Sequence, residues 1–148
     1  MGNTERLFFS DDESSDLQAL LSAQTIDDVV GYPNPLLLEA QLAEQYGVEP
    51  DQVIVTAGGD ESLERACKSV LMPGTQIIVP HPTFEMIPIY AKLCGADVVD
   101  VPWVGGDYPV DEVLGAMTEQ TRAIVMISPN NPTGKALGAS EVEKLVEG

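Results

Sequence analysis

Apolar positions along the chain follow two periods, one typical of buried strands and one typical of helices. Short apolar runs over 53–57, 76–79, 97–101 and 122–128 have the composition of strands buried on both faces. Between most of these runs, apolar residues recur three or four positions apart, as on one face of a helix. This alternation predicts an α/β fold with three layers, in which a mostly parallel sheet carries helices on both faces.

Local signals indicate where several helices begin and end. Asn34 is a good N-cap, Pro35 a good first helical residue and Gly47 a typical stop, which predicts a helix between them. A helix over 84–93 contains Pro88, which is tolerated in a first turn, so its regular part is expected to start near Glu85.

The two ends of the chain are less regular. The cluster from Ser10 to Asp16 is interpreted as a polar turn or N-cap region, followed by leucines at helical spacing. Near the other end, Ser140 and Glu143 fit a capping box, in which each side chain bonds the backbone N–H of the other residue.

The net charge of the chain excludes some classes of function. The chain has 24 acidic against 7 basic residues, a net charge of −17. This balance excludes a generic nucleic-acid binder and a polybasic membrane-surface protein. No apolar run approaches the roughly 18–20 residues needed to span a bilayer, and the N-terminus lacks the layout of a signal peptide, so a cytoplasmic protein is expected. Such acidity is also one strategy of salt-adapted proteins.

The two cysteines, Cys67 and Cys94, are too few and too far apart for a disulfide scaffold or a zinc site. Each has apolar neighbours in a helical pattern, and both are interpreted as reduced core thiols. No metal site is expected.

The first loop that could carry chemistry runs from Thr56 to Ser62, where two glycines precede a helix N-terminus. Unpaired N–H groups and the helix dipole favour an anion there, and glycines let a phosphate approach the backbone. The alternative is an ordinary tight turn with Asp60 as N-cap. Asp60 and Glu61 add negative charge, so a phosphate would need positive partners from elsewhere.

The second loop, from His81 to Glu85, places Phe84 just past a strand end. Its ring could cover a planar ligand, or it could simply pack in the core. His81 is the only histidine, and because it lies between two prolines with no nucleophile nearby, it is interpreted as structural.

The third loop, from Ser128 to Lys135, is the strongest indication of a binding site in the sequence. Prolines fix an extended path and Thr133-Gly134 a turn, so the segment holds an Asn amide rigidly at a strand end. In parallel sheets, ligands bind at this carboxyl edge.

Together, these segments resemble the fold-type-I pyridoxal-phosphate enzymes, specifically the class I/II aminotransferases, and most closely their histidinol-phosphate aminotransferase branch. Four motifs occur in the family's order and spacing. They are Tyr32-Pro33-Asn34-Pro35, Ala57-Gly58-Gly59-Asp60-Glu61-Ser62, Pro82-Thr83-Phe84-Glu85-Met86 and Ser128-Pro129-Asn130-Asn131-Pro132-Thr133-Gly134.

The resemblance implies a role for five residues toward pyridoxal 5'-phosphate. Gly59 and Asp60 would offer backbone N–H groups to the phosphate, and Phe84 would stack on the pyridine ring. Asn131 would bond the phenolic oxygen of that ring. Tyr32 would reach the phosphate of a second subunit, which implies a homodimer.

The resemblance also implies a domain organisation, with 1–30 as an N-terminal arm or small-domain segment and 31–148 as the first part of the large domain. The family's Schiff-base lysine and its partner aspartate lie beyond the Asn-Pro-Thr-Gly segment. None of the four lysines here matches that context, so no catalytic residue is assigned. They are Lys68, Lys92, Lys135 and Lys144.

The implied reaction is amino-group transfer between an amino acid or amino-alcohol phosphate and a 2-oxo acid, with small molecules rather than nucleic acid or membrane as partners. Without the lysine, the chain by itself is expected to be inactive and to bind the phosphate poorly. A pyridoxal-phosphate-dependent decarboxylase or lyase would share all four motifs. The residues also fit a non-catalytic α/β module that binds a phosphorylated ligand, or a purely structural α/β domain.

Overall fold

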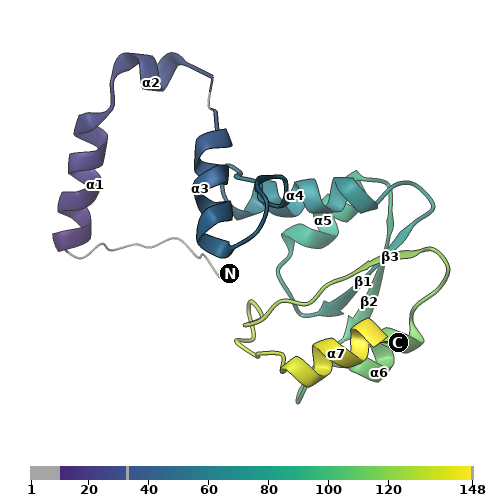
Figure 1. Ribbon diagram of the computed structural model, residues 1–148. Coiled ribbons are helices and arrows are strands. Elements are labelled where there is room, and N and C mark those ends of the chain that lie inside the picture. Colours follow the sequence, from purple (N-terminus) through teal and green to yellow (C-terminus); the bar gives the residue numbers. More distant parts are fainter. Residues whose placement is uncertain (1–10, 33, 148) are drawn as a thin grey trace. The chain divides into compact units, whose positions relative to one another are not determined.

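The computed structural model describes residues 11–32 and 34–147, with side chains from residue 16 onward, and divides into two compact units that meet in sequence at Val55 and Thr56. Each unit is described by itself. The first contains four helices: α1 (Asp11–Ala23), α2 (Ile26–Val30), α3 (Leu36–Tyr46) and the 3-10 helix η1 (Pro50–Gln52). The second contains α4 (Gly59–Val70), β1 (Gln76–His81), α5 (Met86–Leu93), β2 (Asp97–Pro102), α6 (Val110–Gly115), β3 (Thr121–Ile124) and α7 (Ala139–Glu147) (Figure 1).

Two helix boundaries of the first unit differ from the sequence predictions. Residues 11–16, expected as a turn or cap, lie within α1, while Ser10 lies outside the described residues. Helix α3 begins at Leu36, one residue later than expected; Asn34 still caps it, because its Oδ1 accepts the backbone N–H of Leu36 at 3.2 Å. The predicted stop is confirmed, since Gly47 follows the helix in the left-handed conformation with φ of +68°.

The strand expected over 53–57 is not formed. Within the described residues this segment has no ladder partner, and the backbone N–H of Val55 donates instead to the Glu39 carboxylate of α3 at 2.9 Å. An apolar run becomes a strand only when a neighbouring strand satisfies its backbone groups, and here a side chain satisfies one of them.

The three strands of the second unit form a parallel sheet in the order β2-β1-β3. The central strand β1 is buried along its length, as its apolar run predicts. β3 is shorter than the 122–128 expected: Val125 still donates to the carbonyl of Ile78 at 2.9 Å, and regular pairing then ends.

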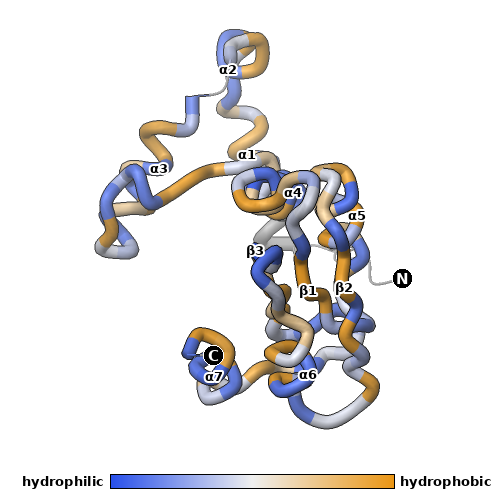
Figure 2. The backbone as a smooth tube through the Cα atoms, turned by 90° about the vertical axis from the view of Figure 1, so that its right-hand side faces the viewer, coloured by the Kyte–Doolittle hydropathy of each residue, from blue (hydrophilic) through white to orange (hydrophobic). Residues whose placement is uncertain are grey.

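Helices cover both faces of this sheet, which confirms the three-layer α/β prediction. Ile77 and Val79 of β1 pack with α4 and α5, while Ile78, between them, packs with α6 and α7. Figure 1 shows the two helix pairs on opposite sides of the strands, and Figure 2 shows the apolar stretch of β1 between them. Because successive strand residues point to opposite faces, one short apolar run supplies both halves of the core.

Helix ends in this unit follow local chemistry with one exception. Pro88 is the third residue of α5, within its first turn, as predicted. The capping box of Ser140 and Glu143 is wrong: α7 starts at Ala139, and it is Glu141 whose carboxylate accepts the backbone N–H of Gly138. Throughout residues 11–32 and 34–147, no helix combines the length and the apolar character needed to cross a membrane.

Candidate functional site

The loop after β1 and the loop after β3 are joined by the side chain of Asn130. Its Nδ2 donates to the carbonyl oxygen of Pro82 at 2.8 Å and to Oγ1 of Thr133 at 2.9 Å. Its Oδ1 accepts from the hydroxyl of Thr83 at 2.7 Å. Asn130 and Thr83 are 2% and 8% exposed. The two strands are neighbours in the sheet, so this amide ties together the carboxyl ends of adjacent strands.

The third loop is further closed by its own backbone. The N–H of Asn130 donates to the carbonyl of Lys135 at 2.6 Å, and the N–H of Gly134 donates to the carbonyl of Asn130 at 2.7 Å. The hydroxyl of Ser128 accepts the N–H of Leu137 at 2.9 Å. The rigidity expected of this loop is therefore supplied by hydrogen bonds as well as by its prolines.

These hydrogen bonds fix the backbone next to two predicted site residues. Phe84 directly follows Thr83 in the loop that connects β1 to α5 and is partly buried; Asn131 directly follows Asn130 and is also partly buried. The structure therefore brings the loops of Phe84 and Asn131 together. Sequence reasoning did not find the amide that joins them, because Thr83 and Asn130 lie 47 residues apart.

The start of α4 presents free backbone donors. Gly58 precedes the helix with φ of +86° and ψ of 175°, a conformation that is essentially limited to glycine. Among the residues that the structure describes, no acceptor faces the N–H of Gly59 or Asp60. A Cβ built on Gly58 or Gly59 would meet no atom within 4 Å, so neither glycine is crowded on that side.

The acidic residues here adopt different roles. Asp60 is the second helical residue and makes no cap, so the N-cap interpretation of Asp60 is wrong. Glu61 turns back instead: its carboxylate accepts the N–H of Ala57 and pairs with Arg65 at 2.6 Å. The N–H of Ala57, followed by Arg65, holds the pKa of the Glu61 carboxyl below its usual value. One of the two acidic groups is thus neutralised in place.

Tyr32 belongs to the first unit, in the connection between α2 and α3, and its side chain is fully exposed. The second unit holds Gly59, Asp60, Phe84 and Asn131, so four of the five predicted site residues share one compact unit.

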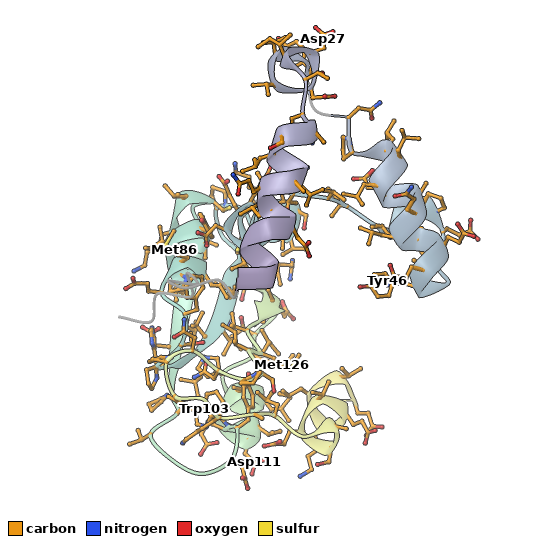
Figure 3. The ribbon with its side chains drawn as sticks, turned by 90° about the vertical axis from the view of Figure 1, so that its left-hand side faces the viewer. Asp27, Tyr46, Met86, Trp103, Asp111 and Met126 are labelled. Carbon is orange, nitrogen blue, oxygen red and sulfur yellow. The ribbon has the colours of Figure 1, made fainter. Side chains whose placement is uncertain are left out.

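Three polar groups that the sequence singled out elsewhere contact neighbouring side chains. His81 Nε2 lies 3.4 Å from Asp100 Oδ1 across β1 and β2. Lys68 Nζ pairs with Glu64 at 2.7 Å, and Lys135 Nζ lies 5.6 Å from the ring centroid of Trp103. Trp103, labelled in Figure 3 with Asp111 of α6, is 3% exposed. Residues 11–32 and 34–147 contain no cluster of three potential metal ligands.

The donor set of the second unit suits a flat anionic ligand. Free N–H groups at a helix start suit a phosphate, an aromatic side chain suits a planar ring, and a fixed amide can bond a ring oxygen. An α/β fold with these groups at its loops is typical of proteins that bind phosphate-carrying ligands. The family model for aminotransferase class I and II matches residues 12–148, and this chain belongs to that family.

Curated relatives are histidinol-phosphate aminotransferases. Histidinol-phosphate aminotransferase 2 of Nitrosospira multiformis is 32% identical over 127 residues, which cover 84% of this chain and 32% of the relative. Histidinol-phosphate aminotransferase 1 of Archaeoglobus fulgidus is 35% identical over 133 residues, covering 87% of this chain and 41% of the relative. The chain thus spans between about a third and two fifths of the length of these relatives.

Solved structures place the fold in the same family. A single mutant of aspartate aminotransferase from Thermus thermophilus matches with a TM-score of 0.80 and 29% identity, over 98% of this chain and 40% of that one. An aspartate aminotransferase from Thermotoga maritima matches with a TM-score of 0.77 and 26% identity, over 98% of this chain and 41% of that one.

Proposed function

We propose that this chain forms the first part of the cofactor-binding domain of a pyridoxal-phosphate-dependent aminotransferase. The observation that carries the proposal is the Asn130 amide, which holds the loops of Phe84 and Asn131 together at the carboxyl ends of β1 and β3. Family membership supplies the reaction class, and the open N–H groups of Gly59 and Asp60 fit the cofactor's phosphate.

Each residue then has a defined task. The N–H groups of Gly59 and Asp60 would hold the phosphate, and the ring of Phe84 would cover the cofactor ring. The side-chain amide of Asn131 would donate to the phenolic oxygen. When bound, pyridoxal phosphate supplies an electron sink that weakens bonds to the amino carbon of a substrate.

The likeness to histidinol-phosphate aminotransferases favours an amino acid or an amino-alcohol phosphate as donor and a 2-oxo acid as acceptor. A homodimer in a cytoplasmic setting follows from the same likeness, with the exposed Tyr32 hydroxyl available to the phosphate of a second copy.

By itself the chain is proposed to be inactive. Lys68 and Lys135 are held by Glu64 and Trp103, and neither Lys92 of α5 nor Lys144 of α7 lies on one of the three site loops. Chemistry on the cofactor needs a lysine at its aldehyde.

A chimera tests the reaction. Replacing the matching third of the Nitrosospira relative with this chain should give an enzyme that transfers the amino group of histidinol phosphate to a 2-oxo acid. In that chimera, Asn131→Ala and Phe84→Ala should each lower kcat/KM by about ten- to a hundred-fold, whereas Val104→Ala, at an exposed side chain that belongs to none of the three loops, should leave it unchanged. A folded chimera that binds the cofactor but transfers no amino group would overturn the proposed reaction.

The inactivity of the chain is tested separately. The 148-residue chain is mixed with pyridoxal phosphate, reduced with borohydride and digested. Scattered, substoichiometric labelling of surface lysines is expected. Stoichiometric labelling of one lysine, together with turnover, would contradict it. Decarboxylation instead of transfer by the chimera would favour a decarboxylase or lyase, and tight binding of inorganic phosphate by the chain, with no preference for the cofactor, would favour the phosphate-ligand module.

A further inference from the structure

Asn130 has a side chain whose orientation the structure determines completely. One hydrogen of Nδ2 points at the carbonyl of Pro82, which can only accept, so the nitrogen and not the oxygen must face it. Oδ1 is then left facing the hydroxyl of Thr83, which must donate. The amide can bond both loops in one way only.

The bond between Thr83 and Asn130 joins two residues that each adjoin a residue of the proposed site. Thr83 precedes Phe84 directly, and Asn130 itself precedes Asn131 directly. A change in the length of the bond between Thr83 and Asn130 therefore changes the separation of the two site residues. Because only 2% of the surface of Asn130 is exposed, water is kept from replacing these bonds.

We propose that Asn130 is a positioning residue, whose amide sets the placement of Phe84 relative to Asn131 without contacting the cofactor. This role rests on the proposed function. This task is separate from that of Asn131, whose amide is assigned to the cofactor itself. The two neighbouring asparagines therefore have different roles: Asn130 positions the two loops, and Asn131 contacts the cofactor.

Gln76 provides a matched control at the other end of β1. Its Nε2 donates to the carbonyl of Ala116 at 3.1 Å and to Oγ1 of Thr121 at 2.8 Å. These are the same kinds of partner that Asn130 bonds, a backbone carbonyl and a threonine hydroxyl. Gln76 also joins two segments of the second unit, but no proposed site residue adjoins it.

The test compares Asn130→Asp with Gln76→Glu, both in the 148-residue chain and in the chimera with the Nitrosospira relative. Each change replaces two N–H donors by an oxygen that faces a carbonyl, at nearly constant size. Amide hydrogen exchange at Gly134, which bonds the carbonyl of Asn130, reports loop closure in the chain, and calorimetric titration of the chimera with pyridoxal phosphate reports the site.

Asn130→Asp should speed exchange at Gly134 by about ten-fold or more and weaken cofactor affinity by a similar factor. Gln76→Glu should lower the unfolding midpoint but change both readouts by less than about two-fold. Thr83→Val should behave like Asn130→Asp, and Thr83→Ser, which keeps the hydroxyl, should behave like the wild type. The threonine pair decides the matter if Asn130→Asp does not fold.

Equal behaviour of Asn130→Asp and Gln76→Glu, or of Thr83→Val and Thr83→Ser, would overturn the positioning role. If the chimera without substitutions binds no pyridoxal phosphate, the proposed cofactor binding fails on its own, and the exchange rates at Gly134 still decide the role of Asn130.

Discussion

The hydroxyl of Tyr108 donates a hydrogen bond to the backbone carbonyl of Val125 at 2.8 Å. Tyr108 is 4% exposed and follows β2, while Val125 directly follows β3, so the bond links segments from the two edges of the sheet. The ring of Tyr108 also meets that of Trp103 edge to face, with centroids 5.3 Å apart. Burial raises the pKa of Tyr108, so its hydroxyl remains a donor well above neutral pH.

Replacing Tyr108 by Phe should therefore destabilise the chain. The change removes the donor and leaves a carbonyl of the core without this partner, which costs about 1–3 kcal/mol. Urea unfolding measures the effect. Tyr46→Phe is the control, because the Tyr46 side chain is 70% exposed, and a shift below about 0.5 kcal/mol is expected there. Equal shifts for the two variants would show that the Tyr108 bond contributes nothing.

Gly58 and Gly59 should respond differently to alanine. Gly58 has φ of +86° and ψ of 175°, where a Cβ is strained, whereas Gly59 is the first residue of α4 and has open space where the methyl group of an alanine would lie. Gly58→Ala should cost about 1–3 kcal/mol of unfolding free energy. Gly59→Ala should be neutral or stabilising by up to about 1 kcal/mol. Thermal and urea unfolding of both variants check this, and a reversed order would contradict the backbone argument.

Glu141 should make stability depend on acidity. The N–H groups of Gly138 and Tyr108 hold the pKa of its carboxyl below the usual value. A lowered folded-state pKa means that the stabilisation is present above the unfolded-state pKa and is lost as pH falls through the folded-state value. Glu141→Gln should thus be less stable than wild type at neutral pH, and the difference should shrink below about pH 4.

Glu143, on the same helix, is the control for this pH dependence. Its side chain is exposed and makes no cap, so Glu143→Gln should follow the wild-type curve of unfolding midpoint against pH. A constant gap between Glu141→Gln and wild type from neutral to acidic pH would rule out the ionic part of the cap.

The two cysteines should differ in reactivity. Cys67 is buried in α4, and burial raises the pKa of its thiol, while Cys94 at the end of α5 is only partly buried. Because the thiolate is the reactive form, iodoacetamide should label Cys94 at least about five-fold faster than Cys67 in the folded chain. In denaturant the two rates should converge. Peptide mass spectrometry follows both sites, and faster labelling of Cys67 would contradict the packing of α4.

Salt should stabilise the folded chain. The net charge of −17 on 148 residues means that the excess carboxylates repel one another in the compact state, and added ions screen that repulsion. The unfolding midpoint should rise as sodium chloride is raised from about 0.01 to 1 M, most steeply at the low end, where the screening length changes most. Sucrose at matched osmolality controls for general solvent effects. A flat or falling midpoint would mean that surface repulsion does not limit stability.

The features that the sequence predicted well are those decided by neighbouring residues. Gly47 ends α3 because the residue after the helix adopts a left-handed backbone, which glycine tolerates best. Pro88 lies in the first turn of α5 because a proline has no N–H to donate. The continuous burial of β1 also follows from its own apolar run. These signals were sufficient for the three-layer fold and for placing Phe84 and Asn131 in loops after strands.

The features that the sequence missed depend on partners far along the chain. The segment 53–57 is as apolar as a strand, but a strand needs a neighbour that its own residues cannot indicate. Glu141 caps α7 in place of Glu143 partly because its carboxylate also accepts the N–H of Tyr108, 33 residues away, at 3.0 Å. The contacts of the Asn130 amide could not be predicted for the same reason, since its main partners follow another strand.

Trp103 gives the molecule an optical reporter of its own. It is the single tryptophan of the chain, and its ring contacts that of Tyr108 while the ammonium of Lys135 lies over it. Lys135 closes the Asn130 loop through its carbonyl. Indole emission should therefore shift whenever this loop opens, so that stopped-flow fluorescence can time the movement of the proposed site without any attached dye.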